Sequence, residues 1–292
     1  MQSLLAHQDV FFSATPAAEK LRYAAAGQAC GGVGYRTLRG KELYDYRPAP
    51  SAAAAGGDDA THPKVPSALA APAPAAYAAL AAAGRDLLAG LDAHPAARVA
   101  TASADLGALC EAEGVAASSL LSLFRYEATA GGAAPHVDRG LLTLVACGDA
   151  GLQLREHASS TDGATTTTPA DNNNDGDEDG DEEARWAALP PLRLGEVAVL
   201  VGATLAAATG NALRAAMHRV LPQPTPRLAA VLRMRGARQA LLPRLTVAAF
   251  ETLFAASRTS VNRDDHGFTA QPMSGASVAA GPSVAQAPRR RM

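Results

Sequence analysis

The sequence has few cysteines, few aromatic residues and no long apolar run. Its three cysteines, Cys30, Cys110 and Cys147, are widely spaced and form no C-x-x-C pair, which argues against a structural zinc or redox site and favours a reducing setting. No window approaches about 18 uninterrupted apolar residues, and the N-terminal MQSLLAHQDVFF lacks the basic and apolar regions of a signal peptide. We therefore expect a cytoplasmic protein without a membrane span, with organelle targeting left open.

Charge of either sign is also sparse. The net charge is -2 and charged residues make up 18% of the chain, so no basic field favours nucleic acid as a partner. With 292 residues and 48% hydrophobic composition, the chain is long enough for one substantial core with appendages. These values leave a small molecule as the expected partner and do not indicate an oligomeric state.

The first part of the chain, residues 1–119, is expected to contain helices and loops. Thr15 and Pro16 form a helix start, and the Ala-rich stretch after them predicts a short helix that ends at Gly27. The Gly- and Pro-rich region 31–71, which contains KELYDYRP, is predicted to be loop. A longer helix follows, with an apolar stripe at helical spacing formed by Tyr77, Leu80, Leu87, Leu88 and Leu91.

From residue 120 to 240 the pattern changes to short runs typical of strands. LLSLFRYEA, GLLTLVACG, GLQLRE, GEVAVLVG, AAMHRVL and RLAAVLRMR are rich in Leu and Val and are separated by turn residues. This pattern predicts an antiparallel barrel or sandwich. A helix is expected at 241–258.

Two further segments have almost nothing apolar to bury and are expected to be disordered: an acidic insert at 157–184 and a polar tail at 259–292. The insert contains DNNNDGDEDGD, which has the Asp spacing of a calcium loop but lacks the Glu at the last ligand position. Calcium binding is therefore disfavoured.

The residues that carry chemistry are His136, Asp138 and His218. In a strand, residues two apart point to the same face, so an H-x-D at the start of a strand would project an imidazole and a carboxylate together. Two His and one carboxylate on one face of iron(II) leave the opposite positions open for a co-substrate and dioxygen. An isolated H-x-D is a weak signal, and its surroundings decide how it is interpreted.

The segment LSLFRYEATAGGAAPHVDRGLLTLVACGDAGLQLRE resembles the iron-binding segment of the isopenicillin N synthase-like 2-oxoglutarate/iron(II) oxygenases, with its strands in the same order. LPPLRLGEVAVLVGATLAAATGNALRAAMHRVLP resembles the later strands of that family, and the resemblance extends from about residue 11 to about residue 258. It implies an α+β fold with a mainly β core: a double-stranded β-helix, or jelly roll, with N-terminal helices packed outside and a C-terminal helix.

The resemblance also implies a site for 2-oxoglutarate. Arg227 matches the family's Arg that binds the distal carboxylate, and Tyr126 matches the Tyr that assists it. The sequence departs from the pattern at Ala229, where the family has Ser, and at Phe124, where it has Asn. The missing hydroxyl should weaken 2-oxoglutarate binding by about 1 kcal/mol.

The implied function is that of an iron(II)- and 2-oxoglutarate-dependent dioxygenase, which hydroxylates or desaturates a small organic substrate and converts 2-oxoglutarate to succinate. Since Asp138 is present, no coordination position is vacated for a halide, and halogenation is disfavoured. No catalytic residue beyond the metal ligands is indicated. Two alternatives stay open: an iron oxidase of the same family that uses dioxygen without 2-oxoglutarate, and a catalytically inactive binding module on the same fold.

Overall fold

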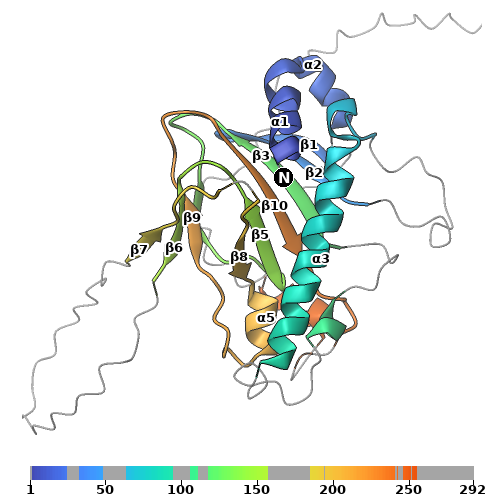
Figure 1. The fold of residues 1–292 in the computed structure, drawn as a ribbon, viewed down its shortest axis with the longest axis vertical. Coiled ribbons are helices and arrows are strands. Elements are labelled where there is room, and N and C mark those ends of the chain that lie inside the picture. The colour runs from blue at the N-terminus through green and yellow to red at the C-terminus, as the bar shows by residue number, and fades with distance from the viewer. Residues whose placement is uncertain are drawn as a thin grey trace, which may run out of the picture.

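Two antiparallel sheets face each other and helices cover the outer side of the larger one (Figure 1). The structure is a computed structural model, which describes residues 2–24, 33–48, 64–94, 106–110, 118–156, 185–193, 195–240, 242, 246–250 and 252–254. The expected acidic insert and polar tail lie outside these residues.

The helical segments are α1 (Gln2–Asp9), η1 (Val10–Ala14), α2 (Ala17–Lys20), η2 (Leu21–Tyr23), η4 (Ser67–Leu69), α3 (Pro72–Ala93), η5 (Gly107–Leu109) and α5 (Ala203–Ala208). The strands are β1 (Gly34–Leu38), β2 (Lys41–Tyr46), β3 (Leu120–Tyr126), β4 (Ala133–His136), β5 (Leu142–Ala146), β6 (Leu152–Arg155), β7 (Trp186–Ala188), β8 (Ala198–Val201), β9 (His218–Val220) and β10 (Arg227–Met234).

The larger sheet has the strand order β1-β2-β3-β10-β5-β8, and the smaller sheet has the order β4-β9-β6-β7. All the pairs are antiparallel. In the described residues the two sheets do not join into a closed barrel. The arrangement fits a jelly roll, as expected, and both groups of predicted strands are present.

The central strands of the larger sheet are buried on both faces, because their side chains alternate between two separate cores. Leu123, Leu144 and Leu232 point toward the helices, and they belong to the core that includes Leu80 and Leu88 of α3. Side chains of the opposite parity lie between the sheets, where Phe124, Val145 and Val231 meet Leu152 and Val220 of the smaller sheet. The inter-sheet face is therefore the face on which a site can form.

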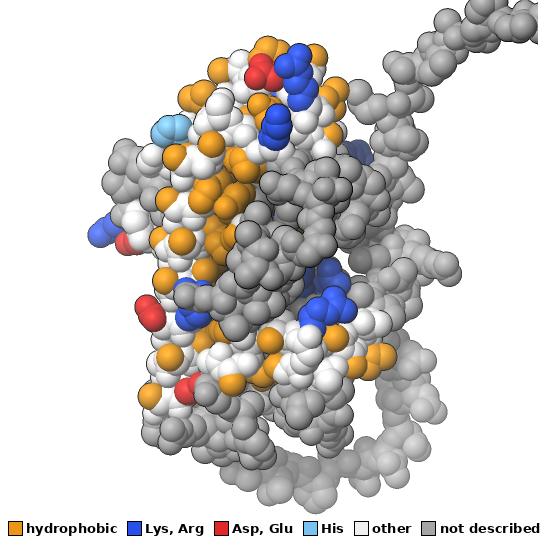
Figure 2. Space-filling model, turned by 90° about the vertical axis from the view of Figure 1, so that its right-hand side faces the viewer, with side chains coloured by type: hydrophobic (Ala, Val, Ile, Leu, Met, Phe, Trp, Pro, Cys, Tyr) orange, Lys and Arg blue, Asp and Glu red, His pale blue; other side chains and the backbone are white. Residues whose placement is uncertain are grey.

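α3 crosses the outer side of the larger sheet. Ser67–Ala93 is the one segment, within the described residues, that is long and apolar enough to span a membrane, and 33% of its most apolar window is buried. Figure 2, which faces the side on which α3 lies, shows hydrophobic side chains in a vertical band. Core helices have the same length and composition, and Leu80 and Leu88 are buried in the core here. The composition of α3 therefore does not assign it to a membrane.

The prediction of loop for residues 31–71 is wrong for β1 and β2, which form an antiparallel hairpin at the edge of the larger sheet. In β2, Leu43 points into the inter-sheet core and Tyr44 into the outer core, so the short segment is held by burial on both faces. Gly40, with φ +71°, allows the tight turn between the strands. The Gly- and Pro-rich composition of the wider window concealed this six-residue strand.

The predicted helix at 16–27 is shorter than expected, since Tyr23 ends its last turn and Ala24 is extended. Before it lies a helix that sequence reasoning missed, α1, whose buried Gln8 donates from Nε2 to the carbonyl oxygens of Phe124 and Ala229 at 2.8 and 3.2 Å. At the other end, the described residues 247–250 and 252–254 are helical, as expected for 241–258.

Candidate metal centre

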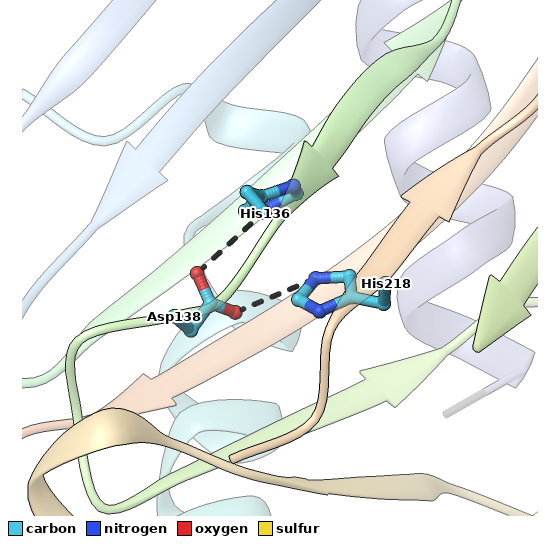
Figure 3. A group of neighbouring side chains, drawn as sticks. All are labelled: His136, Asp138 and His218. Carbon is cyan, nitrogen blue, oxygen red and sulfur yellow. Dashed lines mark ion pairs between the residues drawn. The ribbon is translucent and has the colours of Figure 1, made fainter. Parts of the chain in front are cut away.

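Three side chains from two strands and a loop meet at one end of the inter-sheet space. His136 ends β4 and His218 begins β9, and the two residues are register partners in the smaller sheet, with ring centroids 4.2 Å apart. Asp138 follows two residues after His136. One ligand atom from each of the three residues lies within 4.8 Å of the others, and Figure 3 shows the Asp138 carboxylate facing both imidazoles.

The expectation that Pro135–Asp138 opens a strand is wrong, because β4 ends at His136 and Asp138 lies in the loop that follows. The carboxylate reaches the imidazoles from the loop that leads from β4 in the smaller sheet to β5 in the larger sheet. Its Oδ1 lies 4.0 Å from His136 Nε2, and its Oδ2 lies 3.8 Å from His218 Nε2. The pairing of β4 with β9, rather than strand alternation, accounts for the group.

Both imidazoles are oriented by hydrogen bonds to main-chain carbonyls. His136 Nδ1 lies 2.8 Å from the oxygen of Ala134, and His218 Nδ1 lies 3.0 Å from the oxygen of Ala216. Since a carbonyl oxygen only accepts, each Nδ1 carries a hydrogen, and Nε2 is the nitrogen that faces the group. This arrangement suits a metal bound through Nε2 of each residue.

Burial, with the nearby charge of His218 adding to it, lowers the pKa of His136 to about 4. A neutral imidazole is therefore the form present at neutral pH. For Asp138, burial opposes ionisation, but the charges of Arg233 and His136 and a hydrogen bond from Thr143 outweigh burial and lower the pKa. The group thus offers two imidazole nitrogens and one carboxylate, a donor set that suits iron(II).

Two contacts hold the Asp138 side chain. Thr143 Oγ1 donates to Oδ2 at 2.7 Å, and Arg233 Nε lies 3.7 Å from Oδ1. Both partners come from the larger sheet, Thr143 from β5 and Arg233 from β10. The carboxylate is therefore fixed between the two sheets.

The loop that carries Asp138 lies against α5 through close main-chain contacts. Ala203 N donates to the main-chain oxygen of Asp138 at 2.8 Å, and Gly202 N donates to the main-chain oxygen of Leu141 at 2.9 Å. A Cβ on Gly202 would overlap the carbonyl oxygen of Gly140, and a Cβ on Gly140 would overlap that of Met234. Both glycines are needed because backbone approaches backbone at these positions.

Gly202→Ala should therefore lower the free energy of unfolding by about 2 kcal/mol and weaken metal binding, because the Asp138 loop must move away from α5. Gly148→Ala is the matched control, since a Cβ there meets nothing within 4 Å and its effect should stay within about 0.5 kcal/mol. Urea denaturation of the two metal-free variants measures their stability. Equal midpoints would contradict the close approach at Gly202.

Arg227 and Tyr126, the residues expected to bind 2-oxoglutarate, are register partners on β10 and β3, and both are buried. The Arg227 guanidinium lies 5.4 Å from the centroid of the Tyr126 ring, and its Nη2 donates to Cys147 Sγ at 3.1 Å. Arg227 is 2% exposed and its Nε has no hydrogen-bond partner among the described residues. A buried guanidinium with an unpaired nitrogen fits a carboxylate ligand.

The two departures from the family pattern, Ala229 and Phe124, are also register partners and lie on the inter-sheet face. The Phe124 ring stacks on Tyr126 with centroids 5.5 Å apart. An apolar pair thus occupies the place of two polar side chains beside Arg227. Neither Ala229 nor Phe124 carries a hydroxyl that could replace that of the family's Ser.

Sequence reasoning did not single out Arg233, Thr143 or Lys41. Arg233 has the same strand parity as Arg227, and Thr143 has the same parity as Val145, so both positions could have been found once the strands were assigned. Lys41 was hidden in the segment taken as loop.

No protein-family model matches the sequence, and no curated protein matches it. Solved structures do match. A protein from Shewanella oneidensis assigned as an oxygenase is 18% identical, with 89% of this chain and 85% of that chain covered and a TM-score of 0.63. A 2OG-Fe(II) oxygenase family protein from Caulobacter crescentus is 18% identical, with 88% and 85% covered and a TM-score of 0.61.

A third structure, Neurospora crassa T7H in complex with alpha-KG (2-oxoglutarate) and thymine, is 13% identical, with 88% of this chain and 83% of that chain covered and a TM-score of 0.54. The resemblance noticed in the sequence is confirmed at the level of the fold: the chain has the fold of the 2-oxoglutarate/iron(II) oxygenases.

Proposed function

We propose that this protein is an iron(II)- and 2-oxoglutarate-dependent dioxygenase, which hydroxylates or desaturates a small organic substrate. The observation that carries the proposal is the group formed by His136, Asp138 and His218, with both Nε2 lone pairs directed inward, in the fold of oxygenases of this class. A module that only binds has no need of such an arrangement. The fold that we propose for the protein is a double-stranded β-helix with N-terminal helices packed outside and a C-terminal helix.

His136, Asp138 and His218 would hold the metal, which supplies activation of dioxygen and abstraction of hydrogen from the substrate. The protein's own contribution is to position the metal ligands and to exclude water from the site. Main-chain carbonyls fix both imidazoles, Thr143 and Arg233 fix the carboxylate, and the apolar inter-sheet cluster surrounds the site. Three ligands on one side leave the other positions for 2-oxoglutarate and dioxygen.

Arg227 would bind the distal carboxylate of 2-oxoglutarate. Its planar fork suits a carboxylate, and it stays charged although it is buried. Tyr126 lies under the guanidinium and limits its orientation. The alternative of an oxidase that does not use 2-oxoglutarate is supported by Ala229, which offers no hydroxyl to that carboxylate.

Anaerobic addition of iron(II), then 2-oxoglutarate, tests the proposal. A visible charge-transfer band should develop on the second addition, and admission of air should then produce succinate. Iron binding without the band would favour the oxidase. No iron binding would exclude both enzymes and leave the inactive binding module on the same fold.

A further inference from the structure

The inter-sheet face of the larger sheet carries more positive than negative charge. On its strands lie Arg36, Lys41, Arg227 and Arg233, with Asp45 as the acidic residue of the same face. Asp45 is fully buried, forms an ion pair with Arg36 and accepts a hydrogen bond from Ser122 Oγ. Arg227 is assigned to 2-oxoglutarate and Arg233 contacts the Asp138 carboxylate, so Lys41 is the cation of this face that remains without a stated role.

Lys41 extends over the inter-sheet core rather than into solvent. Its Nζ lies 5.6 Å from the centroid of the Phe124 ring and 5.5 Å from that of Tyr126, and donates to the Gly132 oxygen, just before β4, at 3.4 Å. Among the described residues it has no carboxylate partner. Burial, and to a smaller extent the charge of Arg233, lower its pKa to about 8.

Arg233, near the C-terminal end of β10, approaches the same Phe124 ring. Its guanidinium carbon lies 5.5 Å from the Phe124 centroid, and Nη1 donates to Ser122 Oγ at 3.2 Å. Its Nε is the atom that lies 3.7 Å from Asp138. Arg233 therefore connects the metal ligands to the face on which Lys41 lies.

We propose that Lys41 and Arg233 form an anion clamp over the Phe124 ring, which holds a carboxylate of the substrate beside the metal centre, so that the substrate is a small organic acid. The inference rests on the proposed function and extends it to the class of substrate. Phe124 would supply an apolar surface for the carbon skeleton.

Charge balance supports an anion at this place. With iron(II) and 2-oxoglutarate bound, the charges of the metal and Arg227 balance those of Asp138 and the two carboxylates of 2-oxoglutarate. Lys41 and Arg233 then stay uncompensated in a partly buried space, where unpaired charge is unfavourable. A carboxylate ligand would relieve this repulsion and accept hydrogen bonds from both cations.

The clamp borders the 2-oxoglutarate site at Tyr126. Lys41 and Arg227 are both register partners of Tyr126, and they lie 5.5 and 5.4 Å from its ring centroid. Arg227 and Arg233 stand at opposite ends of β10, about 20 Å apart along the strand. Arg233 would therefore serve the clamp and Arg227 the 2-oxoglutarate, with Lys41 between the two carboxylates.

Isothermal titration tests the clamp with benzoate, cyclohexanecarboxylate and hexanoate, each against its neutral amide. The protein is loaded with zinc as a redox-inert metal and saturated with 2-oxoglutarate. At least one carboxylate should bind about ten-fold or more tightly than its amide. Lys41→Met should remove this preference and Lys41→Arg should retain it, while 2-oxoglutarate affinity should change by less than the affinity for the probe in both.

The inference is overturned if no carboxylate is preferred over its amide, or if Lys41→Met leaves the preference intact. It is also overturned if Lys41→Met weakens 2-oxoglutarate as much as the probe, since Lys41 would then belong to the 2-oxoglutarate site. Titration of metal-free Arg227→Met protein separates the clamp from the proposed function. The carboxylate preference should persist there, whereas failure of the proposed function would appear as failure to bind iron or 2-oxoglutarate.

Discussion

His218→Ala should abolish iron binding and, with it, all 2-oxoglutarate turnover. The imidazole supplies one of three ligand atoms, and Ala offers no atom that could bind the metal in its place. Loss of a hydrogen bond that supports a metal ligand typically lowers metal affinity by roughly 10- to 100-fold. Loss of the ligand itself should lower the affinity further. Anaerobic titration of iron(II) measures the change.

Two variants make the result specific. His94→Ala removes an exposed imidazole at the end of α3 and should leave iron affinity unchanged. Thr143→Val removes the hydrogen bond to Asp138 without a change of ligand, and should weaken iron binding by about ten-fold. Equal affinities of the His218→Ala and His94→Ala proteins would contradict the assignment of the metal centre.

Much of the fold could be predicted from the sequence because the strands carry local signals. LLSLFRY and RLAAVLRM are rich in apolar residues, and burial on both faces keeps such runs extended. β2 carries the same information in KELYDY, but it lies in a window dominated by Gly, Pro and Ala. Its partners on β3 are about eighty positions away, and that tertiary pairing makes it a strand.

The candidate site, like the fold, could be predicted from the sequence only in part. The identity of His136, Asp138 and His218 followed from an ordered set of motifs, whereas their arrangement depends on the pairing of β4 with β9 and on a loop held by Gly140 and Gly202. No local pattern encodes those contacts. Lys41 and Arg233 become neighbours only across three strands and through Phe124, so nothing in their sequence positions connects them.

Arg227→Met should leave iron in place and raise the 2-oxoglutarate concentration needed for half-maximal turnover by about 100-fold. Two charge-assisted hydrogen bonds to one carboxylate are each worth about 1.5 kcal/mol or more, and each 1.4 kcal/mol is about ten-fold. Arg227→Lys keeps the charge but loses the fork, so its effect should be smaller. Succinate formation against 2-oxoglutarate concentration measures the series, with iron affinity as the control.

The same substitution should raise the stability of the protein when 2-oxoglutarate is absent. Arg227 places a guanidinium in the core between the sheets, with a sulfur and an aromatic ring as its neighbours and an unpaired Nε. Met fills similar space without a buried charge, and such replacements are often neutral or stabilising. A higher thermal midpoint for Arg227→Met than for the unchanged protein, reversed on addition of iron and 2-oxoglutarate, would indicate that this side chain is kept for its ligand. A lower midpoint without ligands would instead make Arg227 a structural residue.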